Sequence, residues 1–160
     1  LEGLIMFIRL IGEEDAALAS SATHPFNDVP NWASKYVAYA YEKGYTKGTW
    51  VNTFGTNDTL TAQHFIMLLL RVLGYSEEID FSWDTALDSA RTLGLINGAE
   101  QTLFGSGFNR SRVVYMAYFA LSNTFKGSST SLLNRLINSG VIDAATASSA
   151  MNGVTTSRIV

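Results

Sequence analysis

The chain has 160 residues, of which 47% are hydrophobic and only 16% are charged, and its net charge is −3. This composition excludes a disordered segment, and the negative charge gives no reason to expect binding to nucleic acid. Cysteine is absent, which excludes disulfide frameworks, thiolate metal sites and cysteine nucleophiles, and no apolar run reaches the roughly 18 residues that cross a bilayer.

The first segment, Leu1 to Gly12, predicts a helix that is entered after its start, because it has neither an initiating Met nor an N-terminal cap. We therefore expect the chain to be a piece of a longer protein. Glu13, Glu14 and Asp15 follow at a second predicted helix start, where the helix dipole favours carboxylates.

The next helix is predicted to begin near Pro30 and to end at Gly44, which can adopt the left-handed conformation of a helix stop. Its apolar stripe consists of Trp32, Tyr36, Val37 and Ala40. Trp32 is therefore expected to fill the core. We expect Asp28 to accept backbone N–H bonds in the turn before this helix.

A Gly- and Thr-rich stretch, residues 45–57, is predicted to be a loop. It is followed by an apolar helix from Thr61 to Gly74. In the third part of the chain Asp84 is the predicted N-cap of a helix that ends at Gly94, and a further helix runs from Asn109 to Leu121.

The C-terminal part begins with a predicted turn at residues 126–129. A helix over Leu132 to Asn138 ends at Gly140, and Asp143 caps a short Ala- and Ser-rich piece. The last residues, 152–160, have the composition of a linker or frayed end.

An internal repeat relates these segments at a period of about 50 to 60 residues. The spacing Ala-x-x-x-Gly-x-x-x-Gly occurs at residues 40–48 and again at 90–98, and Phe54-Gly55 then falls opposite Phe104-Gly105. The segment 1–12 matches the second helix of each repeat. In this alignment Glu2, His64 and Arg112 are equivalent. Each repeat is therefore predicted to be helix, loop, helix, and the fold class all-α.

The repeat resembles the S-layer homology (SLH) module of bacterial surface proteins over about three quarters of the chain. That module has Phe-x-Asp-Val, Trp-Ala, two spaced glycines, and a second helix that opens with Thr-Arg-Ala-Glu. The matching residues here are Phe26-Asn27-Asp28-Val29, Trp32-Ala33, Tyr36-Val37, Ala40, Gly44, Gly48 and Phe54-Gly55.

The resemblance implies one SLH-type domain over residues 1–160, with its repeats packed in a pseudo-threefold bundle. Residues 1–12 are expected to be the tail of a truncated first unit, 25–75 the second unit and 80–122 the third. Residues 128–151 would form extra C-terminal helices and 152–160 a tail. We further predict that the helix over 132–138 covers the apolar face left by the missing half-unit.

The function implied by the resemblance is non-covalent, non-catalytic anchoring of a secreted bacterial protein to the cell wall or S-layer. In the family the motif arginine contributes to a groove that recognises secondary cell-wall polysaccharide, which often carries acidic pyruvyl groups. Here the second unit has Ala62 in its place, and only Arg110 of the third unit retains it. Loss of the arginine keeps an alternative open: a degenerate structural spacer or a protein–protein docking module in a larger surface protein.

Four residues are candidates for glycan contact. Arg110 can pair bidentately with a carboxylate, and Arg112 next to it can enlarge the cationic region. For both, a solvated charge without a binding role is the plain alternative. Lys47 lies between two glycines, where the loop can present it to the same groove. Trp50 falls in the same loop and is the expected exposed platform for a sugar ring, whereas Trp83, like Trp32, is expected in the core.

Catalytic motifs are not found. His24 and His64 are the only histidines, and neither belongs to a His-Glu-x-x-His motif. The segment Phe104-Gly105-Ser106-Gly107 lacks the spacing of a nucleophile elbow. Asn57 and Asp58 lack the alternating ligands of a calcium loop. We expect no metal and no cofactor.

Overall fold

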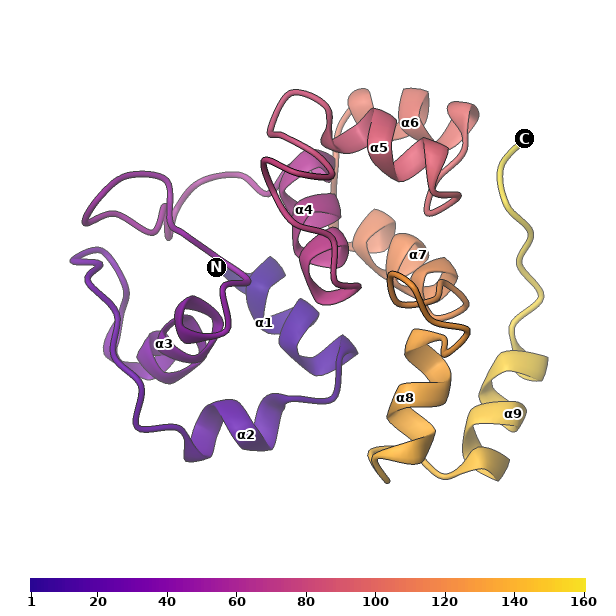
Figure 1. Ribbon diagram of the computed structural model, residues 1–160, viewed down its shortest axis with the longest axis horizontal. Helices are drawn as coiled ribbons and strands as arrows, with labels where there is room; N and C mark the ends of the chain where they lie inside the picture. The colour runs from indigo at the N-terminus through magenta and orange to yellow at the C-terminus, as the bar shows by residue number, and fades with distance from the viewer.

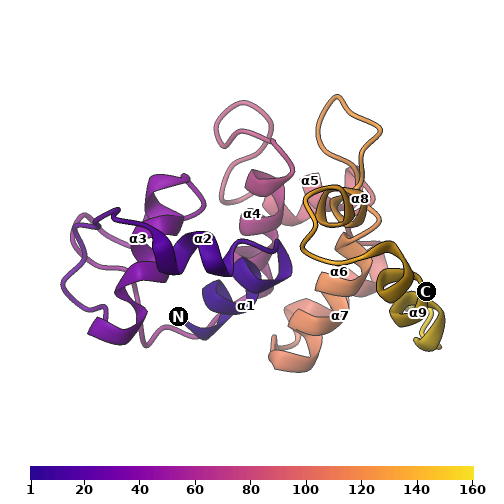
Figure 2. The ribbon, with the colours of Figure 1, turned by 90° about the horizontal axis from the view of Figure 1, so that it is seen from below.

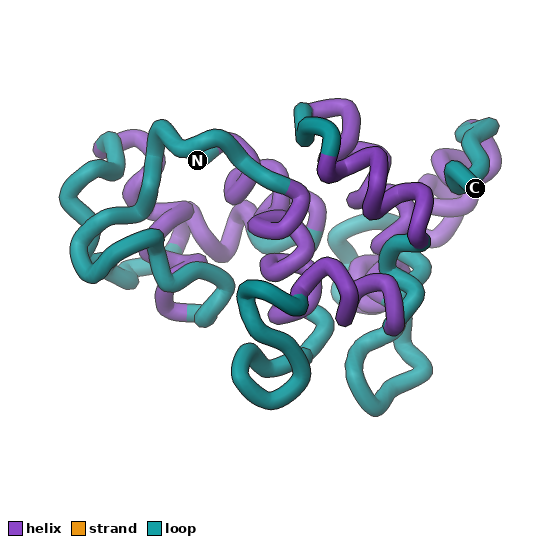
Figure 3. The backbone as a smooth tube through the Cα atoms, turned by 90° about the horizontal axis from the view of Figure 1, so that it is seen from above, coloured by secondary structure: helices purple, strands orange, loops and turns teal.

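Nine α-helices and one 3-10 turn make up the regular structure of the computed structural model, which describes residues 1–160 (Figure 1). The helices are α1 (Glu2–Leu10), α2 (Glu14–Ala19), α3 (Ser34–Glu42), α4 (Ala62–Val72), α5 (Ala86–Thr92), α6 (Gly98–Gly105), α7 (Arg110–Ala120), α8 (Leu132–Asn138) and α9 (Ala144–Gly153). Long loops join them and no strand is formed (Figure 3). The prediction of an all-α fold is confirmed. None of these helices has the length and apolarity needed to span a bilayer.

Three helices, α1, α4 and α7, pack pairwise against one another at the centre of the molecule (Figure 1). Each presents an apolar face, and Phe7, Phe65 and Met116 are almost completely buried there. The rings of Phe7 and Phe65 meet edge to face with centroids 6.4 Å apart. These are the three helices that the repeat alignment treats as equivalent.

The remaining helices surround this centre. Helices α2 and α3 pack together on one side of α1, whereas α6 to α9 lie on the other side (Figure 2). Helix α5 packs against α4, and the small residues Ala86 and Ala90 on its inner face are fully buried. The short side chains let the two helices approach closely.

Most predicted helix ends are confirmed. The chain adopts positive φ at Gly44 (+71°) and Gly94 (+76°), directly after α3 and α5. The side chain of Thr61 caps α4 by accepting a hydrogen bond from the backbone N–H of His64, and Asn109 caps α7 in the same way. The helices over 132–138 and after Asp143 are also present.

The prediction that Asp84 caps α5 is wrong. A turn precedes the helix, in which the backbone N–H of Ser82 donates to Thr85 Oγ1 at 2.8 Å and the N–H of Thr85 donates to the carbonyl of Ser82. The helix therefore begins one residue after Thr85, and its N-terminus has no side-chain cap.

The connection within the third repeat also differs from the prediction, because α6 replaces the expected loop around Phe104-Gly105. Asn97 and Glu100 form a reciprocal capping box: the Asn97 side chain accepts from the N–H of Glu100 at 2.9 Å, and the Glu100 carboxylate accepts from the N–H of Asn97 at 2.8 Å. The segments 25–75 and 80–122, which the sequence predicts to be two units, thus contain α3 and α4 and α5 and α7, and they differ in what joins these helices.

The C-terminal helices are attached to the rest through apolar contacts and hydrogen bonds. Leu132 is fully buried and belongs to the main core, and Leu136 is nearly so. A side chain at Gly12 would collide with Leu136 and Val141, so the end of α1 lies against α8. Residues after α9 are extended, and Arg158 and Ile159 form hydrogen bonds to the third repeat. The end of the chain is therefore docked rather than frayed.

Candidate functional site

A cleft of about 450 Å³ lies between the start of α1, the loop before α4, α4 itself and the segment before α5. Its walls combine apolar side chains with charged and hydroxyl groups. The lining residues on which the argument depends are Lys47, Phe54, Asp58, Leu60, His64, Arg71, Glu77 and Trp83. A mixed lining of this kind can contact both the apolar face and the hydroxyls of a sugar.

One wall of the cleft is a loop that Asp28 holds in place. The Asp28 carboxylate accepts the backbone N–H groups of Phe54, Gly55 and Thr56 at 2.7, 2.8 and 2.9 Å. Burial by itself raises the pKa of Asp28, but these three bonds outweigh it and hold the pKa below its usual value. The prediction that Asp28 accepts backbone N–H bonds is confirmed, although the donors come from the distant loop and not from its own turn.

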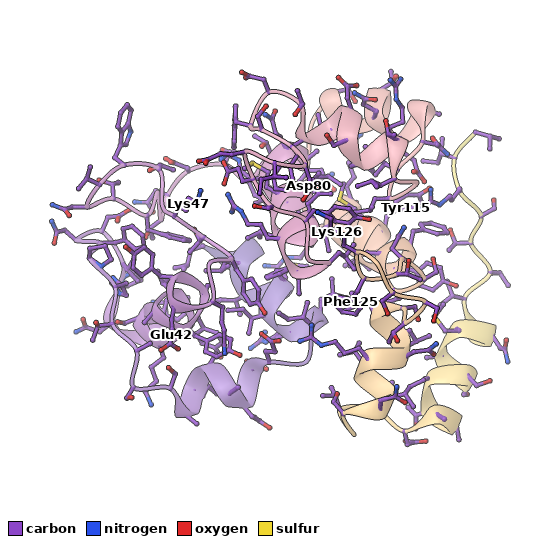
Figure 4. The ribbon with its side chains drawn as sticks, viewed as in Figure 1. Glu42, Lys47, Asp80, Tyr115, Phe125 and Lys126 are labelled. Carbon is purple, nitrogen blue, oxygen red and sulfur yellow. The ribbon has the colours of Figure 1, made fainter.

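A charged cluster at the cleft joins two cations through one carboxylate. Glu77 Oε2 lies 3.0 Å from Lys47 Nζ and 2.7 Å from Arg71 NH2, and Arg71 NH1 donates to the carbonyl of Tyr45 at 2.7 Å. Burial tends to raise the pKa of Glu77, but the bonds to Arg71 and Lys47 outweigh it and the pKa is lowered. The loop thus presents Lys47, which is labelled in Figure 4, at the cleft, with its charge shared with Glu77.

His64 and Trp83 form an aromatic corner of the cleft. Their ring centroids are 4.8 Å apart in an edge-to-face arrangement, and the side-chain amide of Gln63 donates to the carbonyl of Trp83. His64 Nδ1 is 2.7 Å from Thr61 Oγ1, and burial lowers the pKa of the imidazole despite the opposing charge of Asp58. Because Thr61 occupies Nδ1, the imidazole presents its Nε2 to a ligand in the cleft.

The predictions that Trp32 and Trp83 fill the core are wrong. Trp32 is 66% exposed because it lies in the 3-10 turn before α3, where Ala33 takes the buried position. Trp83 is 45% exposed because the turn before α5 leaves Ala86 as the first buried position on that helix. Of the three tryptophans Trp83 is the one that lines the cleft.

Trp50 is 78% exposed, as predicted, and lies at a tight turn of the loop with Val51, which is also exposed. It does not belong to the cleft lining, although Thr49 next to it does. Its role as a platform for a sugar stays a prediction.

The two arginines of the third repeat lie outside the cleft lining. Arg110 NH2 is 2.5 Å from the carboxylate of Glu2, and both side chains are mostly exposed. The pair joins the start of α7 to the start of α1 at the exposed surface. Arg112 instead donates to the carbonyl of Leu103 at 2.8 Å and so ties α7 to the end of α6. The glycan contacts predicted for both arginines stay predictions.

The sequence predicts little of the cleft: Asp58 and His64 are candidates there only for metal or catalytic roles, Trp83 is assigned to the core, and no pattern singles out Arg71 or Glu77. The repeat alignment contains one indication, because His64 takes the position of the motif glutamate, three residues after the cap Thr61. No pattern in the sequence indicates Glu77, since its ion pair with Arg71 forms only because the loop after α4 turns back toward that helix.

Comparison with known proteins identifies a match to the S-layer homology domain over residues 25–65, about a quarter of the chain. An endoglucanase from Bacillus sp. (strain KSM-635) is 34% identical over 73 residues, which are 46% of this chain and 7% of that protein. The chain thus spans a small fraction of this relative's length. No solved structure matches significantly. The resemblance to the S-layer homology domain is confirmed for the matched residues, and domains of this family are non-catalytic modules that anchor proteins at the cell surface through cell-wall polymers.

Proposed function

We propose that this chain is a non-catalytic anchoring domain that holds its parent protein at the bacterial cell wall by binding secondary cell-wall polysaccharide non-covalently in the cleft. The observation that carries the proposal is the coincidence of two features. Residues 25–65 match the S-layer homology domain, and the loop and helix start within that stretch form a large part of the cleft wall.

The chemistry of the cleft suits a sugar ring. Trp83 offers an aromatic face at the rim, and Phe54 and Leu60 add apolar surface below it. Asp58 can accept hydrogen bonds from sugar hydroxyls, whereas the imidazole N–H of His64 can donate one. Lys47 supplies a cation in the cleft lining, where an acidic substituent could compete with Glu77 for it.

The repeat organisation supports the same proposal. We infer that α1, α4 and α7 are the equivalent inner helices of three units, arranged about a pseudo-threefold axis, and that residues 1–12, 25–75 and 80–122 correspond to these units. The pairwise packing of the three helices supports this arrangement. The cleft then lies between neighbouring units, since α1, α4 and the segment before α5 all contribute to it.

The test is retention of the purified chain by cell-wall sacculi before and after chemical removal of secondary polysaccharide. We expect binding that disappears with the polysaccharide and that Trp83→Ala weakens about tenfold. Trp32→Ala is the matched control, because Trp32 is exposed but does not line the cleft. Equal loss in both variants, or binding that survives removal of the polysaccharide, would refute the cleft as the glycan site.

A second candidate is a structural spacer or protein-docking module. It is favoured by Ala62, which stands where the family has its arginine, and by the engagement of Arg110 with Glu2. A folded chain that does not bind intact cell walls but does bind another segment of its parent protein would support this function instead.

A further inference from the structure

The last residues of the chain form a contact that the proposed function does not use. After α9 the backbone runs in extended form back along the molecule toward α6 (Figure 1). Residues 155–157 make no hydrogen bond, whereas Arg158 and Ile159 make several. The segment is thus held at two adjacent residues.

The Arg158 side chain occupies a site with three partners. Its NH2 donates to the carbonyl of Leu95 at 2.9 Å, its NH1 lies 3.6 Å from the carboxylate of Glu100, and its guanidinium stacks 5.0 Å from the centroid of the Phe119 ring. Glu100 is only 1% exposed. A buried carboxylate is expensive without a cation, so the site is suited to arginine.

The backbone of the next residue, Ile159, forms hydrogen bonds through both its N–H and its carbonyl. The N–H of Ile159 donates to the hydroxyl of Tyr115 at 2.9 Å, and the Asn97 side chain donates to the carbonyl of Ile159 at 2.7 Å. Tyr115, which is labelled in Figure 4, donates its own hydroxyl hydrogen to Glu100 at 2.6 Å. The Glu100 carboxylate therefore positions both the Arg158 guanidinium and the Tyr115 hydroxyl that accepts the backbone N–H.

We propose that this surface, formed by Leu95, Asn97, Glu100, Tyr115 and Phe119, is a recognition site for an extended peptide that contains arginine followed by a residue bound through its backbone. Its occupant here is the chain's own Arg158-Ile159. The same segment of a second copy binds the site when the chain's own segment is absent.

Two observations distinguish a recognition site from general packing. Glu100 contacts the arginine side chain and favours a cation. Asn97 and Tyr115 instead form hydrogen bonds with the backbone of the next residue, which must be extended to reach both. The connection 155–157 adds no hydrogen bonds, so the segment can leave as a unit without unfolding a helix. In the intact chain its own segment competes at a high effective concentration, which masks the site from free peptide.

In the experiment, the substitution Arg158→Ala in the full chain removes the side chain that occupies the site. The probe is a fluorescently labelled peptide of residues 155–160, Thr-Thr-Ser-Arg-Ile-Val, and binding is measured by anisotropy. We expect the variant to bind this peptide at least about tenfold more tightly than the unmodified chain does. The same peptide with alanine in place of arginine is the control and is expected not to bind. Tyr115→Phe in the variant background is expected to weaken binding, because it removes the acceptor for the peptide N–H.

A second measurement needs no variant. In the unmodified chain the amide hydrogen of Ile159 is expected to exchange slowly. Free peptide at a concentration well above the effective concentration of the tethered segment, which is about millimolar, is expected to accelerate this exchange by displacing the chain's own segment. The alanine peptide is expected to have no effect. Failure of the arginine peptide in this assay, or in a vacated variant that circular dichroism shows to be folded, would overturn the proposal and reduce the contact to packing.

Discussion

Glu13 and Arg135, which are 122 positions apart, form an ion pair that joins the beginning of α2 to α8. The Glu13 carboxylate also accepts the hydroxyls of Tyr39 at 3.1 Å and Tyr45 at 2.9 Å. Burial and the Glu13 charge raise the pKa of Tyr39 to about 12 and that of Tyr45 further. A single, largely buried carboxylate thus connects the first, second and C-terminal parts of the chain.

Replacing Arg135 with alanine is expected to destabilise the protein by about 1–3 kcal/mol, because it leaves Glu13 without its cation in a mostly buried position. Urea unfolding followed by circular dichroism measures the change. Arg91→Ala is the control, since Arg91 pairs with Asp88 at the exposed surface and is expected to alter stability by less than about 0.5 kcal/mol. Equal effects of the two substitutions would contradict the importance of the Glu13 cluster.

Helix α8 is predicted to cover an apolar face that would otherwise be exposed. Leu132→Ala is expected to cost about 2–4 kcal/mol, since Leu132 is fully buried in the main core. Deletion of residues 128–160 is expected to lower the melting temperature sharply. Ile79→Ala, at an exposed position, serves as the control. An unchanged melting temperature after the deletion would show that α8 and α9 are an independent appendage.

His64 is expected to make stability depend on pH just below neutrality. Burial lowers its pKa in the folded protein below the ordinary value of 6.5, so the unfolded chain binds the proton more readily. The contribution of the neutral ring is complete above pH 6.5 and is lost as the pH falls through the lower folded pKa. His64→Gln is expected to flatten this part of a plot of unfolding free energy against pH. A variant with the same slope as the unmodified chain would contradict the assignment.

Glu77→Gln is expected to change the ligand preference of the cleft, because it removes the carboxylate that Lys47 and Arg71 share. The two freed cations should increase affinity for acidic oligosaccharides by about tenfold and leave affinity for uncharged ones nearly unchanged. Isothermal titration with matched acidic and neutral oligosaccharides measures both. Glu42→Gln makes the same change of charge at an exposed position outside the cleft and is the control. A gain of equal size in the control would attribute the effect to net charge.

Arg110→Ala tests the arginine that the family resemblance singles out. Its exposed pair with Glu2 contributes little, so stability is expected to change by less than about 0.5 kcal/mol. Retention by cell-wall sacculi is nevertheless expected to fall severalfold, since the exposed guanidinium can pair bidentately with an acidic group of the polymer. Arg91→Ala, with the same loss of charge, is expected to retain full binding. Identical retention of both variants would remove Arg110 from the site.

The helices and most of their ends could be predicted from the sequence, because apolar periodicity, caps such as Thr61 and stops such as Gly44 are local features. The repeat alignment predicts a loop where α6 forms, although Asn97 and Glu100 have the spacing of a capping box. The positions of Trp32 and Trp83 were also wrong. Both tryptophans lie in turns just before a helix. If the helical period of apolar residues is extended into such a turn, it places them on the buried face, whereas the turn leaves them exposed.

The cleft was predictable only in part. The resemblance pointed to Lys47, whose loop does line it. Arg71 and Glu77 meet there because the loop after α4 turns back, and Glu13 meets Arg135 because α8 returns to the end of α1. Contacts between residues this distant follow from tertiary packing and leave no periodic pattern in the sequence.

The three N–H bonds that Asp28 accepts have a consequence for the thermodynamics of binding. They fix the backbone of residues 54–56 before any ligand arrives, and the close approach of Gly48, at φ +73°, to Phe26 fixes the other end of the same loop. A sugar that enters the cleft therefore has little conformational entropy of the loop to remove, and more of the contact energy appears as affinity. Under the proposed function, the cleft would hold a polymer through repeated modest contacts with a wall that is already ordered.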